Sequence, residues 1–266
     1  ALGPGDTLWT FDVALGRRSA WSVDGEFLKS HASPAWTVTE AVLFADGTWL
    51  TSGHRPQPEL IGIPFHRFGA DGEHITSFGP EVAVPYEERL RPRGIRRHIV
   101  PGDEMSFWSV RFYEYVLEHF DADGTVLGRI ERRTEWFAST DSIVSIPNRD
   151  QAISPRISSI TRDSSGHLRV AITVPAEDWR SAIGERQEDP RFPGSGAMYT
   201  PILSHDDFFD TIIEVIDSEN RALLASERID AHVLMWADSE HIVTYREDEW
   251  GVPIIDIVRV DLLRPN

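Results

Sequence analysis

The sequence predicts an all-β protein: a β-propeller built from four-stranded antiparallel blades, five of which are visible in the 266 residues. Two local marks recur along the chain, and the strands between them are apolar on both faces. Residues 211–216 and 254–258 show this two-sided pattern, whereas a sheet with one wet face would alternate. Sheets that stack as blades cover both faces of their strands in this way.

The first mark is a turn that leads into a strand rich in tryptophan or aliphatic residues. Such a repeat predicts stacked units, because a single small β unit cannot bury both of its faces alone. The mark occurs five times, at residues 5–9, 46–50, 102–108, 165–170 and 239–243.

The second mark is a hairpin of the Asp-Gly type that joins two apolar strands. Asp-Gly favours a type I′ turn, because both central residues of that turn need a positive φ. The hairpin occurs at Asp24-Gly25, Asp71-Gly72 and Asp123-Gly124, and in a less regular form at residues 216–220. A fifth copy would fall at residues 264–266.

The two marks divide the chain into five units in order, each expected to hold four strands. Their approximate bounds are 1–33, 36–82, 93–131, 155–228 and 229–266. The first unit lacks its first strand and the last unit lacks its fourth, so we expect residues before Ala1 to supply both, and a sixth blade in the intact parent. No Pro/Gly/Ser linker separates two compositions, so we expect a single propeller domain over residues 1–266.

Residues 155–168, the Asp-Gly turns and residues 244–253 resemble the NHL-like six-bladed β-propeller family, which is common among exported bacterial proteins. The resemblance covers nearly the whole chain, although five units are visible where the family has six. It implies the fold and an exported location, which would be periplasmic, lipoprotein-attached or extracellular. The family includes binding proteins and enzymes, so the resemblance implies no single activity.

Composition excludes several classes of partner and site. Asp and Glu outnumber Lys and Arg by 43 to 26, giving a net charge of -17 that repels nucleic-acid phosphates and anionic lipid surfaces. The chain has no cysteine, so disulfides and thiolate sites are excluded. No apolar run approaches the roughly 20 residues that a membrane helix needs, so we expect no membrane span.

An insertion interrupts the fourth visible blade at residues 175–206, where a helix-like stretch at 176–183 precedes several Pro and Gly residues. Long insertions on propellers project from one face, and loops of this length are enriched in function. We expect Trp179 and Arg180 to contribute to binding. The alternative is a surface elaboration without a ligand.

Five arginines gather in residues 89–98 of an otherwise acidic chain. Guanidinium groups bind carboxylates and phosphates through paired hydrogen bonds, so Arg96, Arg97 and His98 are candidate contacts for an anionic ligand. The alternative is a solvated loop whose arginines pair with nearby acidic residues.

The densest group of metal-ligand residue types is His205, Asp206 and Asp207, at the end of the insertion. An imidazole with hard oxygens suits Ca²⁺ or a transition metal. Adjacent residues on a strand point to opposite faces, however, so a solvated acidic turn is the alternative. Apart from Ca²⁺ at such a site, we expect no cofactor.

No catalytic motif emerges from the sequence. Gly194-Ser195-Gly196 has the wrong spacing for a nucleophile elbow, and no phosphate-binding Gly-rich loop is present. We therefore expect a binding or scaffold module for a protein or small ligand, without enzymatic activity. The alternatives are a metal-dependent, lactonase-like hydrolase or lyase that uses the propeller channel, and a purely structural blade array.

Overall fold

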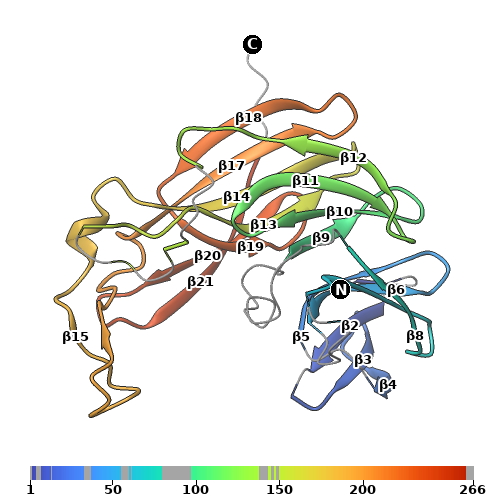
Figure 1. Ribbon diagram of the computed structural model, residues 1–266, viewed down its shortest axis with the longest axis horizontal. Coiled ribbons are helices and arrows are strands. Elements are labelled where there is room, and N and C mark those ends of the chain that lie inside the picture. Colours follow the sequence, from blue (N-terminus) through green and yellow to red (C-terminus); the bar gives the residue numbers. More distant parts are fainter. Residues whose placement is uncertain are drawn as a thin grey trace. The chain divides into compact units, whose positions relative to one another are not determined.

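The computed structural model describes residues 2–3, 7–12, 14–32, 37–54, 60, 62–79, 97–137, 143–144, 147 and 150–261 (Figure 1). The protein is all-β, with the small antiparallel sheets of a β-propeller. The chain divides into two compact units, residues 1–132 and 133–266, each of which is described by itself below. That both units form one domain stays a prediction.

The first unit contains three four-stranded sheets in which each strand pairs with the next along the chain. The first sheet consists of β1 (Leu2–Gly3), β2 (Thr7–Asp12), β3 (Arg17–Ser22) and β4 (Phe27–Ala32). The second consists of β5 (Thr37–Leu43), β6 (Trp49–His54), β7 (Phe65–Phe68) and β8 (His74–Phe78). The third consists of β9 (Arg97–Pro101), β10 (Ser106–Arg111), β11 (Glu114–Asp121) and β12 (Val126–Glu131).

The second unit contains the fourth and fifth sheets. The fourth consists of β13 (Arg156–Arg162), β14 (His167–Pro175), β17 (Phe209–Asp217) and β18 (Ala222–Ile229). Between β14 and β17 lies the insertion, with a 3₁₀ turn at Trp179–Ala182 and the short pair β15 (Gln187–Glu188) and β16 (Met198–Tyr199). The fifth sheet consists of β19 (His232–Trp236), β20 (His241–Glu247) and β21 (Pro253–Arg259).

The five predicted units correspond to these five sheets, and the insertion lies within the fourth as expected. The prediction that the first unit lacks its first strand was wrong, because β1 pairs with β2 through Leu2 and Gly3. A strand of two residues is too short to show a periodic pattern, which is why the prediction missed it. The fifth sheet has three strands within the described residues, as predicted.

The Asp-Gly hairpins are three-residue connections and not the predicted type I′ turns. At the first of them, the Gly25 N–H donates to the Ser22 carbonyl at 3.0 Å. Gly25 has a φ of 84°, but among the described non-glycine residues only Glu104 and Arg221 have a positive φ. A type I turn followed by a left-handed glycine that forms a β-bulge has this pattern. The type I′ prediction was wrong because Asp24 stays outside the left-handed region.

The same connection recurs in both units. Its hydrogen-bonding pattern begins at Ser22, Phe44, Gly69, Asp121, Asp163 and Asp248. After Gly25, Gly72 and Gly124 the strand register also shifts by one residue, which changes the face on which the following side chains lie.

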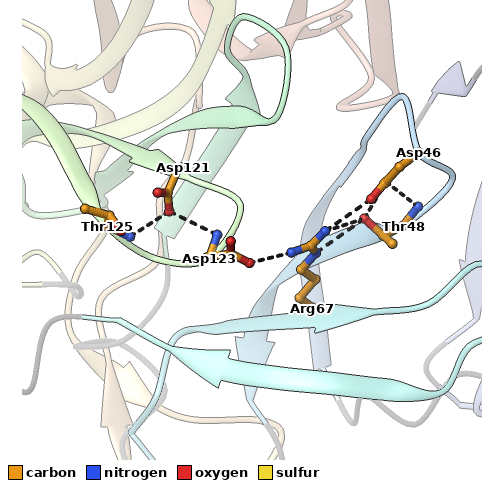
Figure 2. Close-up of polar contacts among 6 residues, drawn as sticks. All are labelled: Asp46, Thr48, Arg67, Asp121, Asp123 and Thr125. Atoms are coloured by element: carbon orange, nitrogen blue, oxygen red, sulfur yellow. Dashed lines mark hydrogen bonds and ion pairs between the residues drawn. The ribbon is translucent and has the colours of Figure 1, made fainter.

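Carboxylates hold these turns together, as Figure 2 shows for the second and third sheets. Asp121 accepts hydrogen bonds from the backbone N–H groups of Asp123 at 3.0 Å and Thr125 at 2.7 Å. Burial opposes ionisation of Asp121, but these hydrogen bonds lower its pKa below the ordinary value. Arg67, on β7, then joins two turns by donating to Asp123 at 2.7 Å and to Asp46 at 3.2 Å.

Both faces are buried in β7, β10, β14 and β17, which confirms the two-sided pattern predicted for residues 211–216. The same prediction was wrong for residues 254–258, which lie on the largely exposed β21. In the first unit a shared core joins the second and third sheets; its buried members are Val42, Phe44, Leu50, Phe65, Ile99, Phe107, Phe120 and Ala122. In the second unit another core joins the fourth and fifth sheets, with Ala171, Ile213, Val233, Trp236 and Ile242.

The fourth and fifth sheets differ at their third strands. β17 is almost entirely buried, with Phe209 and Ile213 in two hydrophobic clusters, and β18 pairs with its outer edge. β21 is largely exposed, and no described strand pairs with its outer edge. Ile255 is 54% and Ile257 is 69% exposed, so this edge presents apolar side chains to solvent.

Candidate functional site

The base of the insertion belongs to the hydrophobic core of the second unit. Trp179, at the start of the 3₁₀ turn, is 6% exposed and packs edge-on against Phe208, with the ring centroids 6.1 Å apart. Ile183 and Phe209 belong to the same buried cluster. The predicted helix-like stretch is therefore one turn, held in place by the apolar side chains that it buries.

Of the two residues predicted to bind through the insertion, only one is exposed. Trp179 is a packing residue, and Arg180 lies over its ring with the guanidinium carbon 4.6 Å from the centroid. Further along, β15 and β16 form a hairpin whose Phe192 and Met198 side chains are 57% and 46% exposed. This hairpin therefore carries exposed apolar side chains, as does Leu203, which is 62% exposed near the end of the insertion.

A group of polar side chains assembles where the insertion returns to the sheet. His205 Nδ1 lies 3.0 Å from Glu247 Oε1, and the Tyr245 hydroxyl donates to the same oxygen at 2.6 Å. The Glu247 N–H donates to Asp206 Oδ2 at 3.2 Å. With His232, which stacks parallel to His205 at 6.3 Å between ring centroids, these residues form what we call the His205 cluster: His205, Asp206, His232, Tyr245 and Glu247.

His232 is the buried member of the cluster. It lies on β19, is 8% exposed, and stacks on Phe209 with the ring centroids 4.3 Å apart. Burial lowers its pKa to about 4, and the positive charges of Arg156 and His205 add to this effect. His232 is therefore a neutral imidazole at neutral pH.

Glu247 is the anionic centre of the cluster. The hydrogen bond from the Tyr245 hydroxyl lowers the pKa of Glu247; burial opposes this effect, and His205 adds to it. The same hydrogen bond raises the pKa of Tyr245. When the Glu247 carboxylate accepts a hydrogen bond from the Nδ1–H of His205, it selects the tautomer with the proton on Nδ1. Nε2 of that ring is then free of a proton and can act as a base or a hydrogen-bond acceptor.

Two of these five residues are among those predicted from the sequence. His205 and Asp206 belong to the cluster, but Asp207 is exposed and its N–H donates to the Ser204 hydroxyl. Across the part of the chain that the structure describes, no group of three or more His, Asp or Glu residues is placed to hold a metal ion. A metal at residues 205–207 stays a prediction that the structure does not support.

His232, Tyr245 and Glu247 were not predicted from the sequence. The only local signal for them is that Tyr245 and Glu247 lie two residues apart on one strand and therefore share a face. Their approach to His205 depends on β19 and β20 lying beside the end of the insertion, which no local pattern reveals.

The two described residues of the arginine-rich segment lie on β9 and are buried. Arg97 donates to Glu118 at 2.7 Å, and burial lowers its pKa. His98 hydrogen-bonds Glu40 and stacks on Phe112 with the ring centroids 4.3 Å apart. The solvated-loop alternative is wrong for these two residues, whose partners include carboxylates of the chain itself.

Arg96, the third predicted contact, lies outside the described residues. An external anion at this segment therefore stays a prediction. None of the helices in the described part of the chain has the length and hydropathy needed to cross a lipid bilayer.

Known proteins resemble this chain in fold and not in sequence. No family model matches the chain, and no curated protein matches it. Similar solved structures include a DUF4221-family member from Bacteroides vulgatus, with 10% identity and a TM-score of 0.55 over 96% of this chain and 76% of that one. Another is virginiamycin B lyase from Staphylococcus aureus, with 12% identity and a TM-score of 0.46 over 99% of this chain and 84% of that one. The likeness to the DUF4221 member shows the fold alone, and that fold is the β-propeller.

Proposed function

We propose that this chain is a binding module that holds a small polar ligand at the His205 cluster. One observation carries the proposal. His232 Nδ1 and Asp206 Oδ1 are both buried and have no hydrogen-bond partner among the described residues. Buried polar atoms nearly always have a partner in the protein, in water or in a ligand, so two such atoms in one cluster mark a place where a partner is expected.

The charges of the cluster favour a ligand that donates hydrogen bonds. Asp206 and Glu247 contribute carboxylates, whereas His232 is neutral because burial lowers its pKa to about 4. Carboxylate oxygens form their strongest hydrogen bonds with charged donors. A small ammonium compound should therefore bind better than a carboxylate of the same size.

The test uses ethanolamine and acetate as two probes of opposite charge. We expect ethanolamine, but not acetate, to shift the imidazole NMR signals of His205 and His232. Glu247→Gln should weaken the effect, because it removes the central charge. The control is Glu249→Gln, which makes the same change at an exposed residue of the following turn. Equal shifts with both probes, or no shift with either, would contradict the binding of a cationic ligand at the His205 cluster.

A protein partner would use the exposed tip of the insertion. The whole insertion cannot be deleted as a clean test, since Trp179 belongs to the core. Replacing residues 188–198 by a short Gly-Ser link removes the apolar tip and leaves that core intact. If the tip binds a partner, this variant should have the melting temperature of the native protein. It should also fail to capture, in a pull-down, the proteins that the native protein captures.

A hydrolase or lyase is the second candidate, and the pair of His205 and Glu247 favours it. A carboxylate-oriented imidazole with one nitrogen left over can act as a general base. Lactone hydrolysis that is lost in His205→Gln would support this candidate. Ca²⁺ or Zn²⁺ should also raise the melting temperature if the reaction needs a bound metal, because a ligand of the native state stabilises it.

The exported location implied by the family resemblance is part of the proposal. Fractionation of cells that express the native gene would test it, and recovery of the protein in the cytoplasm alone would contradict it.

A further inference from the structure

We propose that Ser77, on β8, is a nucleophilic serine that accepts an acyl group from small activated esters. Its hydroxyl lies between two imidazole rings of the first unit. His66 Nδ1 is 2.8 Å from the Ser77 oxygen, and His74 Nε2 is 2.7 Å from it. No other part of the proposed function depends on this site.

The strand register explains why the three side chains meet. His66 on β7 lies directly opposite Ser77 on β8, so both side chains are on one face. His74 precedes Ser77 by three residues and would lie on the other face of a regular strand. The bulge after Gly72 pairs Phe68 with His74 and Arg67 with Thr76, and this shift brings His74 to the face of Ser77.

The geometry gives each ring a different role. A serine hydroxyl has one proton, so it can donate to only one of the two nitrogens, and the other ring must donate its N–H to the oxygen. His66 is fully buried, whereas His74 is exposed and exchanges protons with solvent. We assign the base to His74 and the donor that stabilises the developing alkoxide to His66.

The neighbouring sheets show that this arrangement is not a requirement of the fold. In the first sheet the equivalent cross-strand pair is Ser19 and Ser30, and Phe27 occupies the position of His74. In the third sheet the pair is Glu118 and Arg129. The third sheet has one imidazole on a hydroxyl, since His119 Nε2 lies 2.9 Å from the Ser106 oxygen. Among these described sheets, only the second places two imidazoles on one hydroxyl.

The acylation step is balanced without a cofactor. The Ser77 oxygen bonds to the carbonyl carbon of the ester while its proton passes to Nε2 of His74. The tetrahedral intermediate then loses the alcohol portion of the ester, and His74 returns the proton to that leaving oxygen. The products are acyl-Ser77 and an alcohol or phenol.

The test exposes the full chain to p-nitrophenyl acetate and follows the release of p-nitrophenol. We expect a burst that approaches one equivalent, with the acetyl group mapped to Ser77 by peptide mass spectrometry. Ser77→Ala should abolish the burst. His74→Phe, which copies the first sheet, should slow it by roughly 100-fold, in line with the loss of a general base.

Two controls make the result decisive. Ser30 is the matched serine within the same chain, and it should remain unmodified. The acylation rate of the native protein should rise as imidazole loses its proton, and this pH dependence should vanish in His74→Phe. Thermal melting checks that each variant is folded, and because His74 is exposed, its replacement should leave the melting temperature unchanged. Modification of Ser77 no faster than of Ser30, or an unchanged rate in His74→Phe, would overturn the proposal.

Discussion

Two tryptophan rings enclose the guanidinium group of Arg18 in the first unit. Its central carbon lies 4.8 Å from the ring centroid of Trp9 and 4.4 Å from that of Trp49, and its Nη2 donates to the Ala70 carbonyl at 2.6 Å. Burial lowers the pKa of Arg18 to about 10, against an opposing effect of Asp71, so the group stays charged at neutral pH. A planar cation between two indoles joins the first and second sheets through stacking.

The stacking of Arg18 leads to the first prediction. Arg18→Lys keeps the charge but loses the planar group, so it should lower the free energy of unfolding by about 1 to 2 kcal/mol. Urea denaturation measures this change. Arg17→Lys, at an exposed neighbour on the same strand, is the control and should have almost no effect. Equal effects of the two substitutions would contradict the stacking role.

The buried imidazole of His232 predicts a pH dependence of stability. Its pKa is about 4 in the folded protein, against an ordinary value of 6.5. Between these values the unfolded chain binds a proton that the folded protein does not. The stabilisation is therefore complete above pH 6.5 and declines as the pH falls towards 4, by at most about 3 kcal/mol.

Urea denaturation at pH 7 and pH 4.5 tests this dependence. We expect His232→Gln to lose less stability between the two values than the native protein does. The control is His241→Gln, which alters a more exposed histidine outside the His205 cluster. An unchanged pH dependence in His232→Gln would show that other groups cause it.

At the scale of single elements, two turn glycines show different effects of an alanine substitution on stability. One substitution strains only the backbone, and the other also creates a steric clash. Gly25 has a φ of 84° with open space around an added Cβ, whereas at Gly124, with a φ of 94°, the Cβ would lie 2.5 Å from Phe78. Gly25→Ala should cost about 1 to 2 kcal/mol for the left-handed backbone. Gly124→Ala should cost about 1 to 3 kcal/mol more, because Phe78 must move. Chemical denaturation of both variants checks the difference, and equal losses would show that the contact is relieved cheaply.

The third strands of the fourth and fifth sheets offer a matched pair of isoleucines. Ile213 on β17 is 6% exposed, and Ile257 on β21 is 69% exposed. Replacement of Ile213 by alanine should cost about 2 to 5 kcal/mol, whereas the same change at Ile257 should cost less than about 1 kcal/mol. Denaturation midpoints measure both. A large loss at Ile257 would mean that another chain or segment covers β21 in solution.

The elements also show how far the sequence alone could lead. Recurrent turns predicted the five sheets, because that signal depends on neighbouring residues. The two-sided strand pattern was right for residues 211–216 and wrong for residues 254–258, since burial of a strand face depends on what packs against it. The type of turn was wrong because the dipeptide does not reveal whether Asp24 or only Gly25 enters the left-handed region. The His205 cluster was found in part, since local density marked His205. His232, Tyr245 and Glu247 lie 27 to 42 residues further along the chain, and only the tertiary structure brings them to His205.

At the scale of the whole molecule, the prediction of one domain remains to be measured. The chain divides near Arg132 into two compact units, each with its own hydrophobic core. No linker-like composition separates two domains in the sequence, so we expect one cooperative unfolding transition. Calorimetry should then give equal calorimetric and van't Hoff enthalpies. Two resolved transitions would show that residues 1–132 and 133–266 unfold as separate domains.

The outer edge of β21 carries a consequence for how the protein behaves in concentrated solution. Within the described residues no strand pairs with the backbone amides on that side. A strand of another polypeptide can therefore form hydrogen bonds with this edge. Asp256 forms an ion pair with Arg246, and Arg259 forms one with Glu240. These charges oppose the pairing of another strand with β21, because that strand would have to accommodate them. High salt screens those charges, so oligomers that form through this edge should become more abundant as ionic strength rises.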